Sequence, residues 1–279
     1  MITLPKTYSY AECYLTLRCN FGCPYCINEH TGVKRKRKEL TAREWIMAIN
    51  NVDFGSIPLT LGGGEPTIHG GFYEIVNNIK VRIDLLSNGS FNTTEFLRKL
   101  SPTRFTVSED PSYKSIRLSF HVNNTVPGAI VEKAKMLQAE GYSVGIFGLN
   151  HPENLKANIV MTEYCRSAGV FFFIRDFLGF YEDRLFGHYK YPSGLNGNRK
   201  HCQCKIQELL VGPDGNVFRC HRDLYDDTGE VGSLLNIAYE IKDEFRPCDN
   251  FGLCNNCDLK QKLGPDLKTS KCSVEVQLG

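Results

Sequence analysis

The sequence predicts an α/β fold, with a partial (β/α)6 barrel in residues 1–190 and a small cysteine-rich domain in residues 191–279. The chain has 279 residues, which is enough to bury one large core and leave an appendage. Short β-like runs alternate with helical stretches from about residue 11 to residue 174. The 12 cysteines are unevenly distributed along the chain: three fall within residues 19–26 and seven within residues 202–272.

Six strands are predicted in the first region, at residues 13–18, 58–61, 81–86, 116–121, 143–149 and 170–174. Helices are predicted between them, beginning after Thr41, near residue 72, after Asn92, at Pro127 and between the last two strands. Thr41 and Glu44 have capping-box spacing, and Gly141 suits the position that ends the helix begun by Pro127. Such alternation requires parallel strands with right-handed crossovers.

Polar and glycine-rich segments gather where the predicted strands end, at Cys19, Gly62, Ser87 and His121. The carboxyl ends of parallel strands carry the chemistry in α/β proteins. We therefore expect these four segments to meet in one functional site.

The region after residue 191 differs in composition and no longer shows the strand–helix alternation. Residues 191–197 read as a linker, and residues 206–211 and 216–220 read as a hairpin around Gly215. Residues 233–245 are predicted to be helical, and the remainder is predicted to be irregular. A segment so poor in apolar periodicity is expected to need a metal to hold it together.

Composition narrows the functional classes. The formal net charge is only +2, which argues against a dedicated nucleic-acid binder. The longest apolar runs, such as residues 170–174, fall far short of a membrane span, and the first residues lack a secretory pattern. Twelve cysteines in a chain without an export signal are expected to stay reduced in the cytoplasm, where metal binding is more plausible than a disulfide framework.

Three cysteines follow the first predicted strand as a C-x3-C-x2-C run: Cys19, Cys23 and Cys26. Three thiolates on a tight loop can hold three irons of a [4Fe–4S] cube and leave the fourth iron open to a ligand. Zinc is the alternative, with His30 as a fourth ligand.

This run resembles the signature of the radical S-adenosylmethionine (radical SAM) superfamily. Three further features match that family: the Gly62-Gly-Gly-Glu-Pro66 segment, the Ser87-Asn-Gly89 segment, and an aromatic residue before the third cysteine. By this resemblance the cofactor-binding residues are Tyr25, Gly63, Gly64, Glu65, Ser87, Asn88 and, more weakly, Ser119. Glycine suits the second segment because a Cβ would keep the backbone away from the ligand's amino group.

The resemblance also implies the chemistry. S-adenosylmethionine would chelate the open iron, and one electron from the reduced cluster would release a 5′-deoxyadenosyl radical. That radical would abstract a hydrogen atom from an inert C–H bond, while the protein orients the partners and excludes water. A flavodoxin or ferredoxin is the implied reducing partner.

The C-terminal cysteines resemble the SPASM or twitch extension of the same family. Cys204 and Gly215-x4-Cys220 match its opening, whereas its ending departs from the full SPASM pattern. We expect at least one auxiliary [4Fe–4S] cluster, held by Cys204, Cys220, Cys254 and Cys257. Cys202, Cys248 and Cys272 are alternative ligands, His201 or His221 would complete a second cluster, and a zinc site is the competing interpretation.

Several weaker signals remain. The basic run of residues 34–38 is either a contact for an anionic partner or a solvated loop. Cys165 and His121 are weak catalytic candidates, and each is equally well explained as structural, as is Cys13. Arg175 and Asp176 follow the sixth strand and are candidates for lining the substrate site.

Peptide or protein modification is the leading functional hypothesis, by analogy with families that carry the extension. Small-molecule dehydrogenation or rearrangement and tRNA or nucleoside modification are alternatives within the same chemistry. A non-catalytic iron–sulfur carrier or a zinc-stabilised binding module is the alternative from another class. The Gly-Gly-Glu segment argues against the electron carrier. By the resemblance it binds the ligand that chelates the open iron, and an electron carrier does not need such a ligand.

Overall fold

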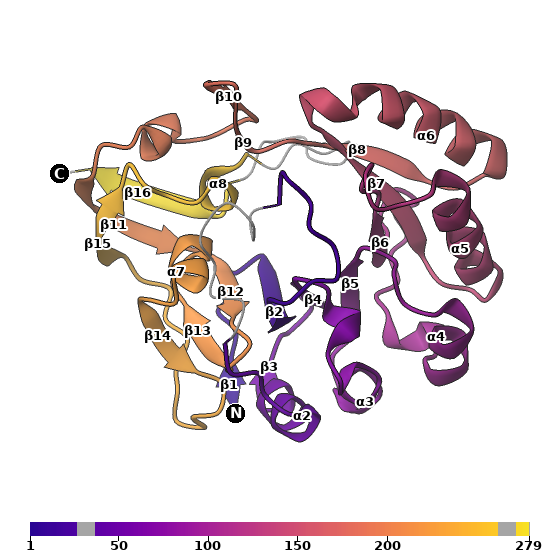
Figure 1. The fold of residues 1–279 in the computed structure, drawn as a ribbon. Coiled ribbons are helices and arrows are strands. Elements are labelled where there is room, and N and C mark those ends of the chain that lie inside the picture. Colours follow the sequence, from indigo (N-terminus) through magenta and orange to yellow (C-terminus); the bar gives the residue numbers. More distant parts are fainter. Residues whose placement is uncertain (27–36, 262–271, 279) are drawn as a thin grey trace.

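The computed structural model describes residues 1–26, 37–261 and 272–278. Its main feature is a nine-stranded sheet in the order β14-β13-β12-β2-β4-β5-β6-β7-β8. Seven of these strands are mutually parallel: β12 (Glu208–Val211) from the C-terminal region and six from the first region, namely β2 (Tyr10–Thr16), β4 (Leu59–Gly63), β5 (Ile83–Ser87), β6 (Ile116–Ser119), β7 (Val144–Asn150) and β8 (Phe172–Asp176). The sheet curves into an open arch (Figure 1), which confirms the predicted α/β fold.

Five helices lie along the outer side of the arch (Figure 1): α2 (Ala42–Asn50), α3 (Phe72–Asn78), α4 (Thr93–Lys99), α5 (Pro127–Ala139) and α6 (Leu155–Ala168). The predicted capping box is present, because Thr41 accepts a hydrogen bond from the amide of Glu44 and the Glu44 side chain accepts one from the amide of Thr41. Asn92 caps α4 through its side chain, and Gly141 follows α5 with a φ of 83°. These local signals fix where the crossover helices begin and end.

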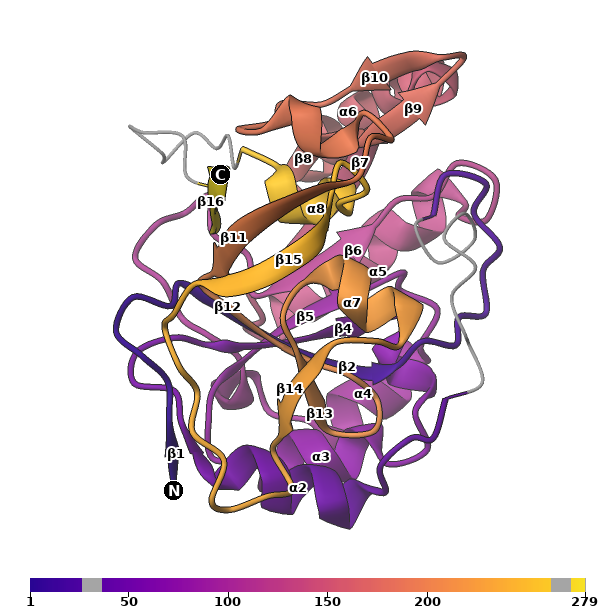
Figure 2. The same ribbon diagram turned by 90° about the vertical axis from the view of Figure 1, so that its left-hand side faces the viewer.

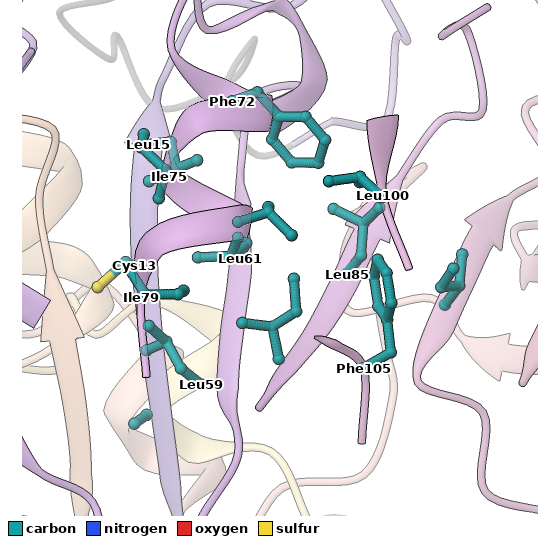
Figure 3. Close-up of a cluster of buried hydrophobic side chains, with 14 of the residues drawn as sticks. Cys13, Leu15, Leu59, Leu61, Phe72, Ile75, Ile79, Leu85, Leu100 and Phe105 are labelled. Carbon is teal, nitrogen blue, oxygen red and sulfur yellow. The ribbon is translucent and has the colours of Figure 1, made fainter. Parts of the chain in front are cut away.

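The two faces of the sheet differ in character. Outward side chains of the strands form the apolar core with α3 (Figure 3), including Cys13, Leu15, Leu59, Leu61, Phe72 and Ile75. The alternate residues of β2 are Tyr10, Glu12, Tyr14 and Thr16, and they lie on the inward face. The inward face at β2 therefore carries polar side chains, although Tyr14 also packs there in a second apolar cluster that includes Leu210 and Phe218.

The C-terminal region completes the sheet. Its hairpin of β12 (Glu208–Val211) and β13 (Asn216–Phe218) continues into β14 (Glu230–Ser233), and Gly215 in the turn has a φ of 81°. Strand β12 pairs in parallel with β2, with Glu208 opposite Tyr10. The two regions predicted from the sequence therefore share one sheet.

A second, smaller sheet lies above this hairpin in both views (Figures 1 and 2). It has the order β15-β11-β16, built from Arg246–Phe251, Lys200–Ile206 and Val274–Leu278. The predicted irregular character of residues 246–251 and 274–278 is wrong, because both segments pair with β11.

The predicted helix at residues 233–245 is also wrong. After β14 the chain turns instead, and the Leu234 amide donates a hydrogen bond to the Gly215 carbonyl (2.9 Å). Leu234 and Ile241 are buried in the main core, so their apolar spacing serves packing against the sheet rather than one face of a helix.

The remaining elements are short: β1 (Ile2–Thr3), β3 (Val52–Asp53), β9 (Gly179–Tyr181), β10 (Arg184–Phe186), α7 (His221–Asp226) and α8 (Asn256–Leu259). Within the described ranges, every helix is too short or too polar to cross a lipid bilayer.

Candidate functional site

The three N-terminal cysteines lie on the loop that leaves β2. The Cys26 amide donates to the Cys23 carbonyl (2.9 Å), which closes a turn and brings the thiols near one another. Burial raises the pKa of Cys23 to about 11, with a contribution from the neighbouring Cys26 and Cys19 because three negative sulfurs repel. A cationic iron cluster would offset this repulsion, so the donor set fits an iron–sulfur cluster.

Two asparagines direct amide groups at these sulfurs. Asn88 Nδ2 lies 3.7 Å from Cys19 Sγ, and Asn124 Nδ2 lies 3.6 Å from Cys23 Sγ. The Phe21 amide also donates to Cys19 Sγ at 3.4 Å. N–H groups around ligating thiolates stabilise the bound cluster and tune its potential.

Zinc at this loop has less support. Among the residues that the structure describes, no three Cys, His, Asp or Glu side chains converge on a single metal ion. Ligands of one zinc ion must all lie about 2–2.3 Å from it, whereas cysteines of a cube bind separate irons and stay further apart. His30, the fourth zinc ligand considered from the sequence, lies outside the described residues.

The glycine segment after β4 packs directly on the end of β2. The Gly64 amide donates to the Thr16 carbonyl and the Glu65 amide to the Arg18 carbonyl, both at 2.8 Å. A Cβ on Gly63, which has a φ of 113°, would meet the Thr16 oxygen at 2.3 Å, and one on Gly64 would meet the Arg18 oxygen at 2.0 Å. These glycines are thus required for backbone packing next to the cysteine loop, a reason that the sequence did not reveal.

We expect Gly64→Ala to lower the free energy of unfolding by about 1–3 kcal/mol, because the new Cβ overlaps a backbone oxygen that cannot move freely. Gly70→Ala is the matched control, since a Cβ there meets nothing within 4 Å, and it should change stability by less than about 1 kcal/mol. Urea unfolding of both variants measures the difference. Equal stabilities would contradict the packing role of Gly64.

Glu65 ties two of the predicted segments together. Its carboxylate is fully buried and accepts hydrogen bonds from Thr67, from Ser87 Oγ (2.9 Å) and from the Asn88 amide (2.6 Å). Burial raises the pKa of Glu65, and these hydrogen bonds oppose that shift. In this structure Glu65 positions the Ser87–Gly89 segment, which in turn carries Asn88 to Cys19.

Tyr25 lies in an aromatic group at the same edge of the sheet. Its ring stacks on His121 (centroids 6.0 Å apart, planes at 21°) and lies 5.4 Å from His151. Its hydroxyl lies 3.2 Å from His121 Nδ1. Burial lowers the pKa of His121 to about 4, so the ring is neutral at physiological pH. This group forms a flat apolar wall beside the cysteine loop, suited to a planar ligand.

Two residues of this site were missed in the sequence. Asn124 follows β6 and His151 follows β7, so both occupy the strand-end position that marked the other segments. Their position after a predicted strand was the available signal. Ser119, predicted as a ribose contact, is half-buried on the inward face of β6.

Other sequence candidates lie elsewhere. Cys165 and Cys13 are buried in the apolar core on the outward side of the sheet. Asp176 forms an exposed ion pair with His188 (2.9 Å). Residues 34–36 of the basic run lie outside the described residues, and Arg37 is held by ion pairs to Asp214 and Asp227 and by the Phe218 ring.

The C-terminal cysteines divide into two sets. One pocket is lined by five of them: Cys202, Cys204, Cys220, Cys248 and Cys254. Cys202 and Cys248 are paired across β11 and β15. Burial raises the pKa of Cys204 above its usual range, and the neighbouring Cys248 and Cys202 contribute to that shift.

Cys257 is absent from the residues that line this pocket. Burial raises the pKa of Cys257, and the charged groups that act on this pKa include Lys260, Glu12 and Glu208. Glu12 and Glu208 lie on the paired strands β2 and β12 of the large sheet. Cys272 Sγ lies 3.7 Å from the Asp258 carbonyl oxygen. His201 pairs with Asp249 (2.6 Å) and His221 with Asp258 (2.8 Å).

Comparison with known proteins agrees with this site. Residues 13–158, more than half of the chain, match the family model of the radical SAM superfamily. A probable GTP 3′,8-cyclase of Methanocaldococcus jannaschii is 28% identical over 253 residues, which cover 87% of this chain and 78% of that protein. A PqqA peptide cyclase of Bradyrhizobium diazoefficiens is 31% identical over 91 residues, 31% of this chain and 24% of that protein.

The fold is similar to the solved structure "Native anSMEcpe with bound AdoMet", with a TM-score of 0.56, 17% identity, and coverage of 81% of this chain and 78% of that one. At this identity the similarity concerns the fold alone. With the family match and the three-cysteine loop, the conclusion is direct: the chain belongs to the radical SAM superfamily and is an iron–sulfur enzyme that uses S-adenosylmethionine.

Proposed function

We propose that the protein abstracts a hydrogen atom from a C–H bond of a small nucleotide-like substrate bound on the inward face of the arch. The observation that carries this proposal is a polar inward face beside the cysteine loop. The relative that spans 87% of the chain is named a GTP 3′,8-cyclase, which favours a nucleotide. Peptide modification, the leading hypothesis from the sequence, is the second candidate and is supported by the shorter match to a peptide cyclase.

The residues of this site have separate roles in the proposed reaction. When bound, the [4Fe–4S] cluster and S-adenosylmethionine supply the electron and the 5′-deoxyadenosyl group for hydrogen-atom abstraction. Cys19, Cys23 and Cys26 would hold the cluster. Glu65 keeps the loops in register through its hydrogen bonds, and Tyr25 with the neutral His121 closes one side of the site against water.

The experiment is an anaerobic incubation of the reconstituted protein with a strong reductant and S-adenosylmethionine. We expect 5′-deoxyadenosine to form, and the addition of GTP to increase its amount and yield a product of changed mass. A response to a peptide encoded beside the gene, with none to GTP, would favour the second candidate. No 5′-deoxyadenosine under any condition would overturn both. A flavodoxin or ferredoxin should replace the chemical reductant.

We also propose an auxiliary [4Fe–4S] cluster in the C-terminal pocket. The five cysteines that line it include three of the four ligands predicted from the sequence: Cys204, Cys220 and Cys254. We place Cys248 rather than Cys257 in the fourth position, because Cys248 lines the pocket with these three cysteines and Cys257 is not among the residues that line it.

We expect Cys220→Ala to lower the iron content from about eight to about four atoms per chain, because one of two cubes is lost. Cys257→Ala is the discriminating variant and should keep about eight. Iron analysis and electron paramagnetic resonance of the reduced proteins measure both. Loss of four irons in Cys257→Ala, with no loss in Cys248→Ala, would show that Cys257 is the fourth ligand, as predicted from the sequence.

A further inference from the structure

Two arginines lie on the inward face of the sheet, apart from the loops that surround the cysteines. Arg117 is on β6 between Ile116 and Leu118, which are buried on the outward side, so its own side chain lies on the inward face. Arg175 is on β8, three residues after Phe172, which packs on the outward core. The strand between them, β7, contributes Phe147 to the same face.

Only some of the hydrogen-bond donors of the Arg117 guanidinium have a partner among the described residues. Its Nη2 pairs with Asp84 Oδ2 at 2.7 Å, and the Tyr113 hydroxyl donates to that same oxygen at 2.5 Å. Arg117 Nε is buried and has no hydrogen-bond partner among the described residues. A buried donor without a partner costs free energy, so a ligand acceptor at this position would stabilise the protein.

In the part of the chain that the structure describes, Arg175 pairs with no carboxylate. Among the described residues its guanidinium lies over the Phe147 ring, 4.9 Å from the centroid, and forms no ion pair. Burial, together with the positive charge of Arg117, lowers the pKa of Arg175 to about 10. Arg175 nevertheless keeps an exposed surface, so a solute can reach it.

The charges that face Arg175 from the other elements do not neutralise it. Lys260, from the segment after α8, is a third cation whose charge acts on Arg175, while Glu12 and Glu208 act on Lys260. Asp84 pairs with Arg117 and Tyr113 through Oδ2, while its Oδ1 is buried and has no hydrogen-bond partner among the described residues. The charge of Arg117 acts on Arg175, and two like charges in such proximity favour the binding of an anion.

We propose that Arg175 and the Nε–H of Arg117 bind an oxyanion of the substrate, a phosphate or a carboxylate, on the inward face of the arch. The planar fork of a guanidinium matches both groups and binds them with two hydrogen bonds. This inference rests on the proposed function, which places the substrate on the same face.

The test is isothermal titration of the purified protein with inorganic tripolyphosphate and, separately, with succinate. We expect Arg175→Gln to weaken binding of the preferred anion by about tenfold to one hundredfold, the effect of losing charge-assisted hydrogen bonds. Arg175→Lys keeps the positive charge but loses the planar guanidinium. Its affinity for the anion should therefore lie between those of the wild type and Arg175→Gln. Arg166→Gln is the matched control, because Arg166 is 76% exposed on α6 and pairs with Glu163; it should bind like the wild type.

The outcomes separate cleanly. Tighter binding of tripolyphosphate assigns a phosphate, and tighter binding of succinate assigns a carboxylate. Equal affinities in the wild type and Arg175→Gln, or no saturable binding of either anion, would overturn the site; thermal melting identifies a variant that has failed to fold. Wild-type protein that forms 5′-deoxyadenosine but binds neither anion refutes this inference alone. Protein that binds an anion through Arg175 but never forms 5′-deoxyadenosine refutes the proposed function instead.

Discussion

Replacing Cys23 with alanine should remove about four irons per chain and reduce 5′-deoxyadenosine formation to the background level. Cys23 is the most buried of the three loop cysteines, and the Asn124 amide donates to its sulfur. Two thiolates would then face a cube that needs three protein ligands. Iron analysis and product chromatography under anaerobic conditions measure the two losses.

Cys13→Ala is the matched control for that experiment. Cys13 is fully buried on the outward side of β2, only ten residues from Cys23, and it belongs to the apolar core. Its variant should unfold somewhat more easily but keep all of its iron. Equal iron content in the Cys13 and Cys23 variants would show that the loop does not hold the cluster.

Glu65→Gln should lower the free energy of unfolding by about 2–4 kcal/mol and weaken binding of S-adenosylmethionine. The carboxylate accepts hydrogen bonds from Thr67, Ser87 and Asn88, and a glutamine amide would turn an N–H toward these donors. With the Ser87–Gly89 segment released, Asn88 would also lose its position beside Cys19. Denaturant unfolding and equilibrium dialysis with labelled S-adenosylmethionine measure the two effects.

Glu74→Gln provides the comparison, because Glu74 is exposed on α3 and the same chemical change there should alter stability by less than about 0.5 kcal/mol. If Glu65→Gln unfolds like Glu74→Gln, the carboxylate has no structural role. If it loses stability but binds S-adenosylmethionine normally, the link between the two loops is not needed for the ligand.

Much of the first two-thirds of the chain could be predicted from the sequence. Periodicity and capping residues such as Thr41 and Asn92 locate the crossover helices, because these signals act within a few residues. The cysteine loop could be assigned for the same reason, since its three ligands are local. The role of Glu65 could not, because its partners Ser87 and Asn88 are more than 20 residues away.

The last third was predicted less well for a physical reason. Residues 233–245 carry an apolar spacing typical of a helix, but Leu234 is fixed by the Gly215 carbonyl on the neighbouring hairpin. Tertiary contacts decided this case, and no local pattern encodes them. The ligands of the auxiliary cluster, among them Cys254 and Cys257, stay a prediction, although Cys254 does line the C-terminal pocket.

The parallel pairing of β12 with β2 has a consequence for biosynthesis. Tyr10 leaves the ribosome about 200 residues before Glu208, its partner across the sheet. Until then one edge of the nascent chain's first long strand has open backbone donors and acceptors, a condition that invites pairing with another chain. Folding of the barrel can therefore finish only after most of the polypeptide has been translated, so truncated chains that end before residue 208 should be prone to aggregation.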